Sequence, residues 1–162
     1  MSVVIEKRDI LNIAVRIEEN GERFYREAAE KAAFYELKEL LNVLARDEVR
    51  HKETFTKMLE NLHPSGEPLS DEYQNYLKAY TERLIFSVDS KDFIEKMKNF
   101  DQLWALDFAI QRELDSILYY YELKNIVARN DHQIIDKIIS EERSHFEKLS
   151  RIKSIIITDN RR

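Results

Sequence analysis

The sequence contains no cysteine and only two glycines and two prolines among its 162 residues. The missing cysteines exclude zinc fingers, thiol catalysis, cysteine-ligated iron–sulfur clusters and rubredoxin-type iron centres. So few turn-forming residues exclude β-sandwiches, barrels and Rossmann-type folds, which need many tight turns. The composition is instead rich in Glu, Lys, Leu, Ile, Ala and Arg. It therefore predicts one all-α domain of long helices over residues 1–162.

The sequence also lacks a basic excess and a long apolar run. Lys and Arg together number 26 against 31 Asp and Glu, for a formal net charge of −5. A protein that binds the nucleic-acid backbone usually carries a basic stripe, so we expect no nucleic-acid partner. The sequence shows neither a signal-like apolar region nor an apolar run of about 18 residues. We therefore expect a cytoplasmic protein that does not bind or enter a membrane.

Four segments carry apolar residues at alternating steps of three and four. This spacing predicts four long helices, each with one face toward a common core, at about residues 8–32, 36–62, 101–129 and 131–156. The single cluster of Pro and Gly falls between the second and third helices. We therefore expect residues 63–100 to form a crossover between the hairpins. This crossover should contain a helix at about residues 70–86, and that helix is long enough to span the bundle. The pattern therefore predicts a four-helix bundle of two antiparallel hairpins joined by a long helical crossover.

Six ionisable residues interrupt the apolar stripes at core positions, namely Glu18, Glu48, His51, Glu113, Glu142 and His145. Each half of the chain contributes one Glu, followed at nearly the same separation by a Glu-x-x-His pair. Burying one unpaired carboxylate costs several kcal/mol, and no Lys or Arg occupies these positions. In each pair the side chains lie one turn apart on one helix face. The carboxylate can therefore bridge two metals while the histidine binds one of them.

The residue types predict a pair of divalent cations, which would neutralise four carboxylates and accept two imidazoles. They leave the identity of the metal open, because this ligand set does not distinguish iron from manganese and also accepts zinc. A metal-free helical scaffold is the remaining alternative. It would leave four glutamates buried without a compensating charge.

The stretches Ile17–Tyr25 and Glu113–Tyr120, together with the two Glu-x-x-His pairs, resemble rubrerythrin-type proteins of the ferritin-like superfamily. The resemblance covers the four predicted long helices. It implies a ferritin-like bundle with a carboxylate-bridged centre of two iron ions. The ligand roles that it implies are bridging for Glu48 and Glu142, terminal for Glu18 and Glu113, and one metal each for His51 and His145.

The residues beside the predicted ligands have more than one interpretation. Tyr25 and Tyr120 are the candidate catalytic residues, and they resemble family tyrosines that hydrogen-bond to the bridging carboxylates. Alternatively, they are core aromatics whose hydroxyls are bonded elsewhere. Gly21 leaves room either for a metal-bound oxygen species or for a close approach of two helices. Asp47 and Glu141 stand four residues before the two histidines, and we interpret them as solvated flank residues rather than as groups that orient the imidazoles.

The chain departs from the rubrerythrin pattern in two respects. It lacks the cysteine-ligated rubredoxin domain that delivers electrons in those proteins. It also has Ser116 where they carry an additional Glu, three residues after the ligand on the third long helix. That Glu is used when a metal shifts on oxidation, so its absence weakens the expectation of efficient peroxide reduction.

The leading hypothesis is a di-iron oxidoreductase that reacts with peroxide or O₂, in oxidative-stress defence or as a ferroxidase-like enzyme. Turnover would require an external electron donor. Trp104, Tyr119 and Tyr121 are interpreted as packing or interface residues rather than as an electron relay. The alternative function is non-catalytic, either an iron-binding or iron-handling protein or a bundle that the metals stabilise. The resemblance also implies a homodimer.

Overall fold

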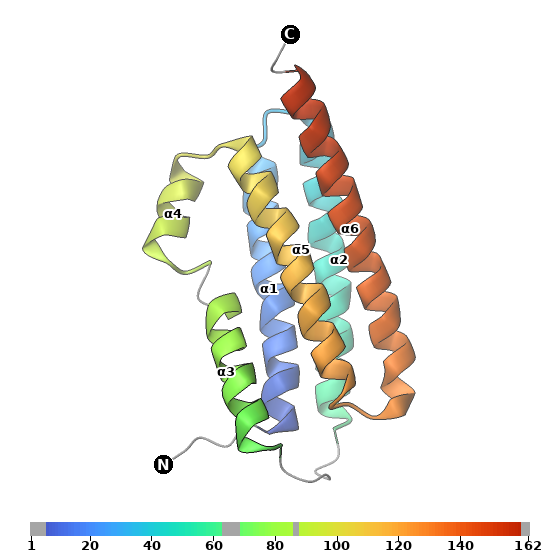
Figure 1. Cartoon of the computed structure of the whole chain (residues 1–162). Helices are drawn as coiled ribbons and strands as arrows, with labels where there is room; N and C mark the ends of the chain where they lie inside the picture. Colours follow the sequence, from blue (N-terminus) through green and yellow to red (C-terminus); the bar gives the residue numbers. More distant parts are fainter. Residues whose placement is uncertain (1–5, 63–68, 86–87, 160–162) are drawn as a thin grey trace.

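The computed structural model describes residues 6–62, 69–85 and 88–159, and within them every regular element is helical (Figure 1). The four long helices are α1 (Lys7–Lys31), α2 (Tyr35–Glu60), α5 (Gln102–Lys124) and α6 (His132–Asp159). Helices α1 and α2 form one antiparallel hairpin, and α5 and α6 form the other. The predicted all-α bundle of two hairpins is therefore confirmed.

Two shorter helices, α3 (Asp71–Ile85) and α4 (Lys91–Lys98), lie in the crossover between the hairpins. Helix α3 packs along α1, and α4 lies between it and the end of the bundle where α5 begins (Figure 1). Ser90 caps the N-terminus of helix α4, because its hydroxyl accepts a hydrogen bond from the amide of Phe93 at 3.1 Å, a standard N-cap contact. The Pro/Gly cluster at residues 63–68 lies outside the described residues.

The third long helix is shorter than predicted, because α5 ends at Lys124 rather than at residue 129. The amide of Asn125 bonds to the carbonyl of Glu122, and the amide of Ile126 bonds to that of Leu123, which tightens the last turn. Ile126 is buried beneath this turn. No Gly or Pro marks the stop, so the sequence gives no signal for it. A 3₁₀ turn, Arg129–Asp131, then leads directly into α6, which continues to Asp159, three residues beyond the predicted end.

The apolar core consists of two clusters separated along the bundle axis. On α1, for example, Ile10 and Leu11 belong to one cluster, and Phe24 and Ala28 belong to the other. The same division occurs on α2, α5 and α6, and on each helix the predicted ionisable residues fall between the two clusters. The core therefore sandwiches one polar layer between two apolar ones. No helix in the described part of the chain is both long enough and apolar enough to cross a membrane.

The turn between α1 and α2 contains no Gly or Pro, and a side chain from the other hairpin stabilises it. The Oε1 atom of Gln102, at the start of α5, accepts hydrogen bonds from the amides of Ala33 (3.0 Å) and Phe34 (2.8 Å). These contacts join the two hairpins at one end of the bundle. They also satisfy turn amides that no helix hydrogen bond reaches.

We predict that Gln102→Ala lowers the free energy of unfolding by about 1–2 kcal/mol, because it removes two hydrogen bonds that each contribute about 1 kcal/mol. Urea denaturation at matched metal content measures the change. Gln111→Ala, on the exposed side of the same helix, is the control and should change stability by less than about 0.5 kcal/mol. Equal effects of the two substitutions would contradict this role for Gln102.

Candidate metal centre

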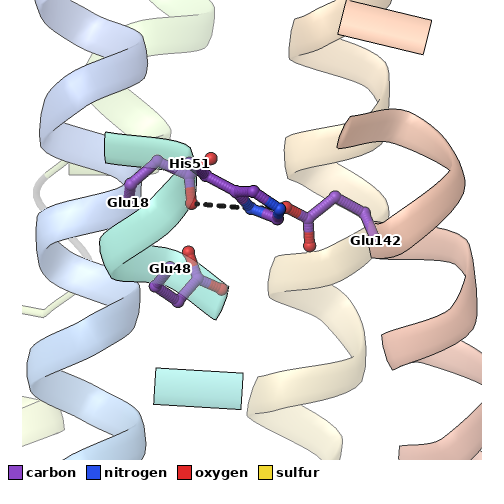
Figure 2. A group of neighbouring side chains, drawn as sticks. All are labelled: Glu18, Glu48, His51 and Glu142. Atoms are coloured by element: carbon purple, nitrogen blue, oxygen red, sulfur yellow. Dashed lines mark ion pairs between the residues drawn. The ribbon is translucent and has the colours of Figure 1, made fainter. Parts of the chain in front are cut away.

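All six predicted ligands meet in the polar layer, with exposed fractions between 1% and 6%. Each of the four long helices places its predicted ligands at the same height along the bundle axis. They are Glu18 on α1, Glu48 and His51 on α2, Glu113 on α5, and Glu142 and His145 on α6. The ligand atoms form two groups, and within each group they lie within 4.8 Å of one another. The first group is Glu18, Glu48, His51 and Glu142 (Figure 2), and the second is Glu48, Glu113, Glu142 and His145.

Glu48 and Glu142 belong to both groups, whereas the other four residues belong to one group each. Two cations placed in these groups would therefore share two carboxylates. Each cation would in addition have one terminal Glu and one His. This division of roles is the one that the family resemblance implies for these residues.

The inward-facing atoms of the first group fit a cation. Three of them, Glu18 Oε2, His51 Nδ1 and Glu142 Oε1, are fully buried and make no hydrogen bond of regular geometry, although they lie in ion-pair contact with one another. His51 Nδ1 lies 2.9 Å from Glu142 Oε1 and 3.5 Å from Glu18 Oε2. Buried polar atoms that lack partners are rare in proteins. Carboxylate oxygens and an imidazole nitrogen are ligands that iron, manganese and zinc accept.

The second group has the same plan. His145 Nδ1 lies 3.1 Å from Glu142 Oε2 and 3.7 Å from Glu113 Oε2. In both groups the histidine therefore presents Nδ1 to the carboxylates. The two imidazole rings lie with their centroids 6.1 Å apart, so the two groups are adjacent halves of one centre.

Without a metal, the centre retains protons that a cation would displace. Burial, reinforced by neighbouring glutamate charges, raises the pKa of Glu48 and Glu113 well above the usual value. Burial also acts to raise the pKa of Glu142, but hydrogen bonds with Glu113 and both histidines hold it below the usual value. The carboxylates therefore carry less negative charge than four ionised groups would, and metal binding releases protons.

The outer nitrogen of each imidazole contacts a carboxylate from the opposite hairpin. His51 Nε2, on α2, lies 2.8 Å from Glu141 Oε2 on α6, and His145 Nε2, on α6, lies 3.0 Å from Asp47 Oδ2 on α2. Such contacts fix the ring and direct the other nitrogen toward a metal. The interpretation of Asp47 and Glu141 as solvated flank residues is therefore wrong. Each carboxylate orients the histidine of the facing helix and not the one on its own helix.

Arg50 connects these two outer carboxylates. Its guanidinium lies 2.5 Å from Asp47 Oδ1 and 3.5 Å from Glu141 Oε2. Burial acts to raise the pKa of Asp47, but hydrogen bonds with Arg50 and His145 lower it overall. Asp47 therefore stays ionised and accepts the imidazole N–H.

Tyr25 and Tyr120 donate hydrogen bonds to ligands, but not to the predicted ones. The Tyr25 hydroxyl donates to Glu113 Oε1, and the Tyr120 hydroxyl donates to Glu18 Oε1. The acceptors are thus Glu113 and Glu18, which each belong to one ligand group, rather than the shared Glu48 and Glu142. Each hydroxyl crosses between α1 and α5, and sequence spacing cannot show which carboxylate it meets. Burial, with the nearby carboxylate charges, raises the pKa of both tyrosines, so both remain hydrogen-bond donors.

A family model described as Rubrerythrin matches residues 9–153 of the chain. The chain belongs to the rubrerythrin family. A crystal structure of a protein from Thermotoga maritima, described as a candidate ferritin-like diiron-carboxylate protein, has a TM-score of 0.72 to this chain at 31% identity. The match covers 95% of this chain and 98% of that one. A search of curated proteins gives no match.

Within this rubrerythrin-family bundle, Gly21 makes room for a ligand. A Cβ atom at this position would lie 2.9 Å from both Cδ and Oε2 of Glu48, closer than real Cβ contacts. The carboxylate of Glu48 thus occupies the space that a side chain would fill. Gly21 therefore makes room for the Glu48 carboxylate, a role that differs from both interpretations offered by the sequence.

Arg112 is a buried residue of the polar layer that the sequence pattern did not indicate. It is only 8% exposed, and its guanidinium donates a hydrogen bond to the Ile17 carbonyl at 3.2 Å. Arg112 and Ile17 directly precede Glu113 and Glu18 in the sequence, so the contact joins α1 to α5 beside the two terminal glutamates. Its position just before a predicted ligand was the one available signal.

We predict that Asp47→Ala weakens zinc binding by about 10–100-fold, because the His145 ring loses the carboxylate that orients it. Competition titration against a chromophoric chelator measures the affinity. Glu53→Ala removes an exposed carboxylate from the same helix, and it should leave the affinity unchanged. If both variants bind zinc as the unmodified chain does, Asp47 has no role in orienting the ligand.

We also predict that the metal-free protein becomes less stable as the pH rises above 6.5. Burial acts to lower the pKa of the imidazoles, but hydrogen bonds with the glutamates raise it, to about 12 for His51 and about 10 for His145. A pKa raised above its unfolded value of 6.5 gives stability that is complete below 6.5 and declines toward the folded pKa. Thermal melts from about pH 6 to 9 measure this decline.

The stabilisation by zinc should grow over the same pH range, because the metal requires neutral imidazoles. The difference in melting temperature between zinc-loaded and metal-free protein at each pH gives this quantity. A metal-free protein whose melting temperature rises between about pH 6.5 and 9 would contradict the protonation described for the two histidines.

Proposed function

We propose that the protein is a carboxylate-bridged di-iron oxidoreductase that reacts with peroxide or O₂. One observation carries the proposal, namely that two buried ligand groups share Glu48 and Glu142. Shared carboxylates support a closely spaced metal pair rather than two independent ions. When bound, two ferrous ions would supply the two electrons that reduce peroxide to water.

The chain's own residues bind the metals, orient the ligands and exclude water. The four carboxylates offset the charge of the metal pair, and the two apolar clusters cover the polar layer from both sides. Tyr25 and Tyr120 each hold one oxygen of a terminal glutamate. The second oxygen of that glutamate is thereby left to face the metal position. Such pre-organisation reduces the rearrangement that metal binding requires.

A surface groove supports access of a small oxidant. It lies between α2 and α6, has a volume of about 500 Å³, and is lined by residues that include His51, Thr54, Lys137 and Glu141. The groove therefore reaches the outer edge of one imidazole that faces the ligand groups. A small oxidant such as peroxide or O₂ in this groove would therefore lie beside the His51 imidazole.

We also propose an external electron donor. The sequence has no cysteine that could ligate a rubredoxin-type iron centre to deliver electrons to the metal pair. We also retain the proposal of a homodimer, which the family resemblance implies, and that of a cytoplasmic location, which the sequence pattern favours. Ser116 favours a second candidate function, iron binding or handling without catalysis. It stands where rubrerythrins carry the additional Glu that accompanies metal oxidation.

The test is anaerobic loading with Fe(II), followed by rapid mixing with peroxide or O₂ while ferric absorption is recorded. We predict a ferric band that forms faster than with free Fe(II), because the four carboxylates stabilise the higher charge. Glu48→Ala removes a shared ligand and should lose the band. Glu53→Ala, an exposed carboxylate on the same helix, is the matched control and should retain it.

The outcomes separate the two candidate functions. Iron that binds at the centre but reacts no faster than free Fe(II) would support iron handling and overturn the oxidoreductase. A chain that binds no iron would overturn both.

A further inference from the structure

The two ligand groups offer the same ligands, but they differ on the side where the outer nitrogen of each histidine lies. Each group has one terminal glutamate, one histidine and the two shared carboxylates. The support of the terminal glutamates is also equivalent, because a buried tyrosine donates to Glu18 in one group and to Glu113 in the other. We refer to the group that contains His51 as the His51 position and to the group that contains His145 as the His145 position.

The first difference is the groove between α2 and α6. It is lined by His51 and by Glu141, the carboxylate that contacts His51 Nε2. The equivalent pair of the other position, His145 and Asp47, does not line this groove. His51 is itself only 2% exposed, so its imidazole separates the groove from the ligand groups. One side chain therefore closes the His51 position on this face.

The second difference is the cation that holds each outer carboxylate. Arg50 supplies this cation on α2, whereas the equivalent residue of α6, which also directly precedes the histidine, is Ser144. One guanidinium therefore serves both carboxylates, at 2.5 Å from Asp47 Oδ1 but at 3.5 Å from Glu141 Oε2. Lys137 lies 4.0 Å from Glu141 and its side chain is 76% exposed, so this contact adds little. Glu141 is thus held more loosely than Asp47.

The third difference is the number of hydrogen bonds on each imidazole. His145 makes one at each ring nitrogen, to Glu142 Oε2 at 3.1 Å and to Asp47 Oδ2 at 3.0 Å. His51 makes only the one at Nε2, to Glu141, because its Nδ1 makes no hydrogen bond of regular geometry. The groove, of about 500 Å³, exceeds the volume of an imidazole ring. An outward turn into it would therefore cost His51 a single hydrogen bond.

We propose that divalent metal ions enter and leave the centre at the His51 position, through the groove, when the His51 side chain turns outward. The ion at the His145 position is retained longer, because its histidine is held by the more firmly bound carboxylate. His51 is thus a gating ligand, and Glu141 is the residue that positions it. This inference rests on the metal pair of the proposed function but on no reaction with peroxide or O₂.

Zinc release tests whether the two positions differ. Protein loaded with zinc at both positions is mixed with an excess of the chromophoric chelator pyridylazoresorcinol, and the absorbance of the zinc complex is recorded over time. We expect a fast and a slow phase of equal amplitude, one for each position. A single phase that releases both ions would overturn the proposal.

Ile134→Trp tests the groove as the route. Ile134 lines the groove and is 44% exposed, so a tryptophan there occupies space into which the His51 ring would turn. We expect the fast phase to slow about tenfold, which corresponds to a barrier that is higher by about 1.4 kcal/mol. Ile155→Trp is the matched control, because Ile155 is an exposed isoleucine of α6 that does not line the groove. Equal effects of the two substitutions would overturn the route.

Conservative changes of the two outer carboxylates assign the phases. Glu141→Gln replaces the carboxylate that holds His51 with a weaker acceptor, and we expect it to speed the fast phase about tenfold, the lower end of the effect that such partners have on metal binding. Asp47→Asn should instead speed the slow phase. If Asp47→Asn speeds the fast phase and Glu141→Gln does not, the gate is not at His51.

Anomalous diffraction identifies the two ions directly. Crystals of the zinc-loaded protein are soaked in a chelator for increasing times, and the two anomalous peaks are compared. The peak beside His51 should weaken first. Earlier loss of the peak beside His145, or equal loss of both, would overturn the proposal.

These measurements are independent of the proposed reaction, because zinc takes no part in electron transfer. Two zinc ions that leave in one phase would overturn the gate and leave the oxidoreductase proposal standing. An iron-loaded protein that is inert to peroxide and O₂ would overturn the proposed function, whereas the zinc measurements would still decide the role of His51.

Discussion

Four carboxylates at one level of an apolar core form the constraint on which the rest of this structure depends. Their burial and mutual repulsion raise the pKa of Glu48 and Glu113, so the metal-free core holds protons that it would release to a cation. Two divalent ions would remove the repulsion and bind buried atoms that now make no hydrogen bond of regular geometry. The apolar clusters on either side keep the layer dry, which strengthens every electrostatic interaction within it. Fold stability and metal chemistry are therefore coupled through these same side chains.

The supporting contacts cross between the two hairpins rather than staying within one. Each outer carboxylate, Asp47 or Glu141, holds a histidine of the opposite hairpin. The two buried tyrosines likewise exchange acceptors between α1 and α5. Neither hairpin alone thus contains an oriented half-site, and the centre forms only when the hairpins dock. This exchange also explains why two similar halves act as one centre, with Glu48 and Glu142 common to both ligand groups.

Periodicity within one helix predicted most of the fold and the set of residues that meet in the polar layer. A seam position fixes which face of a helix a residue occupies, and each Glu-x-x-His pair shares a face regardless of its neighbours. Side-chain contacts between helices could not be predicted from this periodicity, because they depend on the axial register of the two hairpins. The acceptor of Tyr25, the role of Glu141 and the turn contact of Gln102 all belong to this class. The early end of α5 was missed for another reason, namely that no Gly or Pro marks it.

The central claim is that six buried residues hold two metal ions that share two carboxylates. The most direct measurement is anomalous X-ray diffraction from crystals of the protein loaded with manganese or zinc. We predict two anomalous peaks per chain, both within ligand distance of Glu48 and Glu142, with His51 on one ion and His145 on the other. A single peak, or none in the polar layer, would contradict it.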